Sequence, residues 1–167
     1  MKKIISVLSL AILFLCACGG NKINITPVTR GISFTAELTY YNECFRADVK
    51  VTKDGETDME ITSPDTIKGL MFHFNGDSVT AEYSGLEYKA DFKSLPEGVC
   101  CAKLYEILKD TFNKDTTVAL EGDSYYIVRD GEDLSYKLCL GATGLPISAE
   151  EISTGFTVNF KNVTILN

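Results

Sequence analysis

The chain has 167 residues, of which 45% are hydrophobic, and a formal net charge of −7. This length suits one domain with a core large enough to fold without metal ions or disulfide bonds. The acidic balance repels phosphate backbones and anionic headgroups, so we expect neither a nucleic-acid partner nor electrostatic docking to lipid.

The N-terminus has the layout of a signal peptide. Lys2 and Lys3 precede an apolar run, residues 4–15, which is shorter than the roughly 20 residues that a membrane-spanning helix needs. The motif LCAC at residues 15–18 then resembles the bacterial lipobox, in which a small residue stands before the cysteine that accepts the lipid. The resemblance implies diacylation (palmitate) of the Cys18 thiol and cleavage before it. An ordinary cleavage site with a chance cysteine is the alternative.

This interpretation makes residues 1–17 a signal peptide and residues 18–30 the lipidated cysteine and its tether. The predicted location is the extracytoplasmic face of the cell membrane, with the lipid as the membrane contact. Cleavage removes two lysines and no acids, which changes the net charge from −7 to −9.

Alternating apolar and polar residues predict a series of strands along the rest of the chain. Glycine, asparagine and aspartate separate them, as in residues 53–55, 75–77 and 130–132, and favour hairpin turns. The predicted strands cover residues 32–40, 45–51, a short segment with Met59 and Ile61, 70–74, 79–83, 86–92, 117–120, 125–129, 134–140, a segment around 145–147, and 155–166.

One helix is predicted, from about residue 96 to 110. Cys100, Leu104, Ile107 and Leu108 recur there at spacings of three and four, and Pro96 stands near the start.

The predicted sheet is much wider than this helix. Ten strands about 4.8 Å apart span roughly 48 Å, whereas a 14-residue helix is about 21 Å long. The sheet must therefore curl around the helix, which predicts a mainly β (α+β) fold for residues 31–167: a curled antiparallel sheet that forms a half-barrel or open barrel around one amphipathic helix. Any space left inside would be an apolar groove. A sheet that closes on itself and packs solid is the alternative.

The order of strands, one central helix and further strands resembles the half-barrel family of lipoprotein carriers (LolA/LolB-like), in its Gram-positive form. Residues 61–64 (ITSP), 67–70 (IKGL), 83–86 (YSGL) and 145–147 (LPI) are similar to segments of those proteins. The resemblance implies an apolar groove that binds a lipid acyl chain or a lipidated partner.

Catalysis has little support in the sequence. The single histidine, His73, falls on the polar side of its strand, and there is no glycine-rich phosphate loop. The acidic pair Glu150-Glu151 is interpreted as solvated charge at a turn. We therefore expect a protein that is not an enzyme, with no cofactor.

Four cysteines remain after Cys18, and their spacing fits no zinc site. They allow up to two disulfide bonds, with free, buried cysteines as the alternative. Helical geometry directs Cys100 and Cys101 about 100° apart, so we expect only Cys100 to face the core and at most one disulfide to form.

Two functions follow from these observations. The first is a membrane-anchored lipoprotein that binds an acyl chain or lipidated partner in its groove. The second is a non-catalytic structural or interaction lipoprotein of the cell envelope, for example in sporulation, with a solid core and an envelope protein as its partner. For the first, the predicted groove residues are Phe34, Leu38, Phe72, Phe74, Tyr83, Tyr88, Leu104 and Leu108.

Overall fold

The computed structural model describes residues 25–96, 99–113, 116–132 and 134–167. The predicted signal peptide, Cys18 and the first part of the tether lie outside these residues. Within the described part of the chain, no helix combines the length and the apolar character needed to cross a membrane.

The described residues form eleven strands, one α-helix and two short 3₁₀ helices. In chain order these are β1 (Ile32–Tyr40), β2 (Glu43–Val51), β3 (Thr57–Ser63), η1 (Asp65–Ile67), β4 (Met71–Asn75), β5 (Ser78–Tyr83), β6 (Leu86–Asp91), η2 (Phe92–Ser94), α2 (Cys100–Asn113), β7 (Val118–Glu121), β8 (Ser124–Arg129), β9 (Tyr136–Leu140), β10 (Pro146–Glu151) and β11 (Phe156–Ile165).

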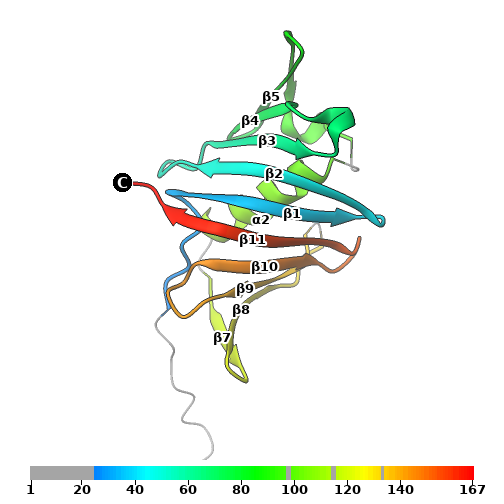
Figure 1. Cartoon of the computed structure of the whole chain (residues 1–167). Coiled ribbons are helices and arrows are strands. Elements are labelled where there is room, and N and C mark those ends of the chain that lie inside the picture. The colour runs from blue at the N-terminus through cyan, green and yellow to red at the C-terminus, as the bar shows by residue number, and fades with distance from the viewer. Residues whose placement is uncertain (1–24, 97–98, 114–115, 133) are drawn as a thin grey trace, which may run out of the picture.

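All eleven strands belong to one antiparallel sheet with the order β6-β5-β4-β3-β2-β1-β11-β10-β9-β8-β7. The first and last strands of the chain, β1 and β11, pair at the centre, so each half of the sheet extends outward from them as a meander. The sheet does not close, since β6 and β7 remain as separate edges. This confirms the predicted open, mainly β architecture with one helix, and α2 lies against one face of the sheet (Figure 1).

The alternation seen in the sequence produces the two faces of the sheet. In β1, the odd-numbered residues are half-buried on one face, whereas Ile32, Phe34, Ala36, Leu38 and Tyr40 are all buried on the other. We call the face that carries these buried residues and α2 the inner face, and the opposite face the outer face.

The helix α2 begins at Cys100, later than predicted, and just before it the Val99 amide donates to the Pro96 carbonyl at 3.1 Å. The sheet surrounds α2 so fully that none of residues 100–112 is exposed. For the same reason the prediction that only Cys100 faces the core is wrong: Cys100 and Cys101 are both buried.

Candidate functional site

The eight predicted groove residues do not share one environment. Five of them are at most 4% exposed and belong to the buried core between the sheet and α2: Phe34, Leu38, Phe74, Leu104 and Leu108. Phe72 is half-buried, and Tyr83 and Tyr88 are exposed. The protein's own side chains therefore fill the space beside Leu104 and Leu108, where the sequence predicted a groove.

Beyond the helix, the inner face is not covered. Phe72 stands opposite the buried Met59 on one side and Ala81 on the other, and Ala81 stands opposite Tyr88. Residues that are opposite each other in neighbouring strands have their side chains on the same face of the sheet. These side chains therefore extend the inner face from the core out to the edge strand β6. We call this surface the open inner patch; it consists of Leu70, Phe72, Ala81, Tyr83, Leu86 and Tyr88.

The open inner patch becomes more exposed toward the edge. Tyr83 is 39% exposed, Tyr88 63% and Leu86 77%. Large apolar side chains gathered on one surface of this kind are typical of sites that contact lipid or another protein.

An aromatic cluster separates the patch from the core. The Phe72 and Phe74 rings stack with centroids 5.9 Å apart, and Phe74 stacks in turn on Tyr105 of α2 at 4.6 Å. Phe92 meets both Phe74 and Tyr105 edge-on. Because Phe74 and Tyr105 are fully packed while Phe72 is half-buried, a ligand on the patch would touch this cluster at Phe72.

A hydrogen bond from the patch also fixes one of its rings. The Tyr83 hydroxyl donates to the Thr66 carbonyl in η1 at 3.2 Å. This bond satisfies the polar end of Tyr83, so its ring is free to offer an apolar surface.

The outer face carries a groove whose lining mixes charged residues with apolar ones such as Met71. It has a volume of about 590 Å³ and crosses β1 to β5, and its polar lining includes Asp48, Lys50, Glu60 and Glu82. His73 lines it too, and lies on the polar side of β4 as predicted.

His73 has an acidic partner that lies 15 residues away in the sequence. Its Nδ1 lies 2.6 Å from an Asp58 carboxylate oxygen, and the two side chains are 47% and 58% exposed. Asp58 and His73 are opposite each other in the β3–β4 register, so only the pairing of these strands reveals the contact. At this exposure, water solvates both groups, and the pair is an ordinary surface contact.

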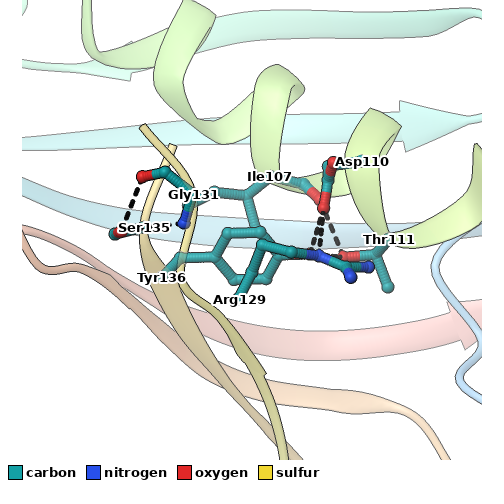
Figure 2. A network of polar contacts seen from close by, with 7 residues as sticks. All are labelled: Ile107, Asp110, Thr111, Arg129, Gly131, Ser135 and Tyr136. Carbon is teal, nitrogen blue, oxygen red and sulfur yellow. Dashed lines mark hydrogen bonds and ion pairs between the residues drawn. The ribbon is translucent and has the colours of Figure 1, made fainter. Parts of the chain in front are cut away.

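A partly buried polar network joins α2 to the other half of the sheet (Figure 2). The Asp110 carboxylate accepts hydrogen bonds from Arg129 Nε at 2.9 Å and from the Tyr136 hydroxyl at 3.0 Å. The Thr111 hydroxyl donates to the Ile107 carbonyl at 2.7 Å and lies 2.9 Å from the Tyr136 hydroxyl. Each hydroxyl has a single proton, so with Tyr136 donating to Asp110 the Thr111 proton serves either the Ile107 carbonyl or the Tyr136 oxygen, not both at once.

The environment of this network also shifts two pKa values. Burial alone would lower the pKa of Arg129, but the hydrogen bonds and electrostatic attraction of Asp110 and Tyr136 together outweigh burial and raise that pKa. Burial raises the pKa of Tyr136. Arg129 therefore stays charged and Tyr136 stays neutral at physiological pH, which suits a contact that holds the helix in place rather than one that transfers protons.

The cysteines of the described part of the chain form no disulfide bond and no metal cluster. Cys44, Cys100, Cys101 and Cys139 are free, and no three His, Cys, Asp or Glu residues there are grouped so that they could hold a metal ion. That at most one disulfide forms stays a prediction.

Comparisons with known proteins identify the fold and no family. No family model matches the sequence, and no curated protein is similar to it. Among solved structures, an uncharacterized conserved protein from Thermus thermophilus is similar with a TM-score of 0.54 and 11% identity, over 84% of this chain and 81% of that one. A LolA superfamily protein from Nitrosomonas europaea is similar at a TM-score of 0.44 and 9% identity, over 81% of this chain and 85% of that one. At these identities the likeness concerns the fold alone.

Proposed function

We propose that this chain is a non-catalytic lipoprotein, anchored through Cys18 on the extracytoplasmic face of a membrane, that holds an acyl chain or an acylated partner on its open inner patch. The observation that carries the proposal is the exposure of Tyr83, Leu86 and Tyr88 on the same face as the core. The lipobox at residues 15–18 supports the anchor.

The chemistry of the patch fits an acyl chain. Each methylene that leaves water contributes about 0.8 kcal/mol, so eight methylenes on the patch would contribute roughly 6 kcal/mol before ordering costs. A surface that is open on one side covers each methylene only in part. We therefore expect weak, reversible binding, which suits a protein that presents or passes on a lipid.

The anchor is tested by Cys18→Ala in the full chain. Loss of the lipid acceptor should release the protein from the membrane fraction, because the lipid on Cys18 is the proposed membrane contact. Metabolic labelling with a palmitate analogue provides the direct readout. A variant that stays labelled and membrane-bound would contradict the lipoprotein interpretation.

Acyl-chain binding is tested with a fluorescent fatty acid and the detergent-solubilised full chain. Leu86→Ser and Tyr88→Ser should each weaken binding severalfold without unfolding the protein, because both side chains are exposed. Val128→Ser is the matched control: Val128 is 50% exposed and stands opposite Lys137, on the outer face. Equal binding by all three variants would exclude the patch as the site.

The second candidate is a structural or interaction lipoprotein of the envelope that binds no lipid. The filled core beside Leu104 and Leu108 favours it, because an acyl chain has no place there. The fatty-acid binding measurement distinguishes the acyl-binding candidate from the interaction candidate. Absence of any saturable fatty-acid binding by the parent protein would leave the interaction role as the better account.

A further inference from the structure

The strand β6 is an edge of the sheet with its outward side unpaired. Among the described residues, its only neighbour is β5, through a two-residue turn at Ser84-Gly85 that has positive φ at both positions. In such a hairpin the flanking residues Tyr83 and Leu86 form a hydrogen-bonded pair. The backbone groups of Leu86 and Tyr88 therefore point to β5, whereas those of Glu87 and Lys89 point outward.

The sequence of β6 is self-complementary when it is read against itself in the antiparallel direction. Centred on Tyr88, the segment LEYKA places Leu86 opposite Ala90 of a second copy, Glu87 opposite its Lys89, and Tyr88 opposite its Tyr88. An unpaired sheet edge is a template for just this kind of pairing.

The hydrogen-bonding pattern agrees with this register. Glu87 and Lys89 are the residues whose amides and carbonyls face outward, and they are also the residues that meet across the two copies. The Tyr88 pair then falls at a non-hydrogen-bonded position, where opposite side chains approach most closely and aromatic pairs are favourable. A shift of the pairing register by one residue would remove both the Glu87–Lys89 pairs and the Tyr88 pair.

Charge favours a second copy in the same way. Glu87 stands opposite Glu82 of β5 on the outer face, and like charges in that position are destabilising. Within one copy, Lys89 lies 2.7 Å from Glu87 and offsets part of this repulsion. In the paired arrangement, the Lys89 of the second copy lies on the free side of each Glu87.

The other edge strand of the sheet, β7, lacks this self-complementary charge pattern. The strand β7 has four residues, VALE, with no basic side chain, and its Glu121 is already 2.6 Å from Lys137 of β9.

We infer that this protein forms a twofold homodimer through antiparallel pairing of its β6 strands, with Tyr88 at the twofold axis. The two sheets then continue into one, and the open inner patches of both copies lie side by side on the same face. The dimer contact uses the backbone edge of β6, so it does not depend on whether the patch binds an acyl chain.

Charge exchange in the full, detergent-solubilised chain tests this inference by sedimentation. Glu87→Lys and Lys89→Glu should each weaken the dimer by about tenfold, because each variant places like charges opposite one another twice. A mixture of the two variants should dimerise again, since each pair of facing positions then holds one lysine and one glutamate. The double variant Glu87→Lys/Lys89→Glu should dimerise for the same reason. Glu121→Lys, at the other edge, is the control and should dimerise as the parent does.

Cross-linking in intact membranes tests the register. With Cys44→Ser as background, because Cys44 is exposed, Tyr88→Cys should form a covalent dimer on oxidation, and Val128→Cys should not. A monomeric parent, single charge variants that dimerise like the parent, or a mixture that stays monomeric would overturn the inference.

Discussion

Lys109 and Asp110 are adjacent on α2, yet they attach the helix to opposite halves of the sheet. The Lys109 ammonium lies 2.8 Å from Asp77, in the turn between β4 and β5, while the Asp110 carboxylate lies 2.9 Å from Arg129 of β8. Successive helical residues point about 100° apart, so one side chain reaches toward the β4–β5 turn and the next toward β8. These contacts attach α2 to both halves of the sheet.

The two attachments should differ in energy. The Asp110 side chain is 9% exposed and Arg129 26%, whereas Asp77 is 75% exposed. Asp110→Ala would leave Arg129 and Tyr136 without their acceptor, and should lower the free energy of unfolding by about 2–3 kcal/mol. Lys109→Met should cost less than about 1 kcal/mol. Urea unfolding measures both, and equal losses would contradict this ranking.

Glu151 gives a pH-dependent contribution to stability. Burial alone would raise its pKa, but hydrogen bonds from the amides and hydroxyls of Ser153 and Thr154 outweigh burial and lower it from 4.5. Because the pKa is lower in the folded state, the stabilisation is fully present above the unfolded value of about 4.5 and is lost as the pH falls through the folded value.

Glu151→Gln should therefore be less stable than the parent at pH 7, and the difference should shrink as the pH falls below about 4.5. Unfolding midpoints in urea, measured for both proteins from pH 7 to pH 3, provide the comparison. Glu150→Gln, at an exposed neighbouring position, is the control that accounts for the loss of one negative charge. A difference between parent and Glu151→Gln that stays constant with pH would show that the carboxylate is not the group responsible.

The sequence identified nearly every strand, because a half-buried strand alternates regardless of what covers it. For the same reason alternation could not locate the site. Phe74 and Tyr88 have the same pattern and lie on the same face, but α2 covers Phe74 completely and leaves Tyr88 63% exposed. The buried state of Glu151 was missed as well, since the turn residues that bond to its carboxylate look like ordinary solvated polar residues in a sequence.

The distinction between core and patch can be measured. Leu104 is fully buried, so Leu104→Ala should lower the free energy of unfolding by about 2–5 kcal/mol. Leu86 is 77% exposed, so Leu86→Ala should change the free energy of unfolding by less than about 0.5 kcal/mol. Thermal unfolding of the two variants compares them directly. A large loss for Leu86→Ala would mean that the patch is covered in the folded protein, for instance by a tightly held ligand.

Gly144 holds the segment that leads from the sheet toward the predicted anchor. Its φ is +82°, and a Cβ at this position would overlap the Thr26 carbonyl oxygen, while the Val28 amide donates to the Gly144 carbonyl at 2.9 Å. A backbone atom cannot move aside as a side chain can. Gly144→Ala should therefore detach residues 25–28 from the turn between β9 and β10, as well as straining the backbone.

Gly155→Ala provides the matched control for this last prediction. Gly155 has a similar φ of +69°, but a Cβ there would meet no atom within 4 Å, so its substitution reports backbone strain alone, about 1 kcal/mol. Gly144→Ala should lower the free energy of unfolding by more than Gly155→Ala does. In hydrogen exchange, the Val28 amide should lose its protection only in Gly144→Ala. Limited proteolysis should likewise cut the segment 25–28 faster in Gly144→Ala. If both variants behaved alike, the contact between Gly144 and Thr26 would not be what fixes the segment to the sheet, and the length of free tether would be set elsewhere.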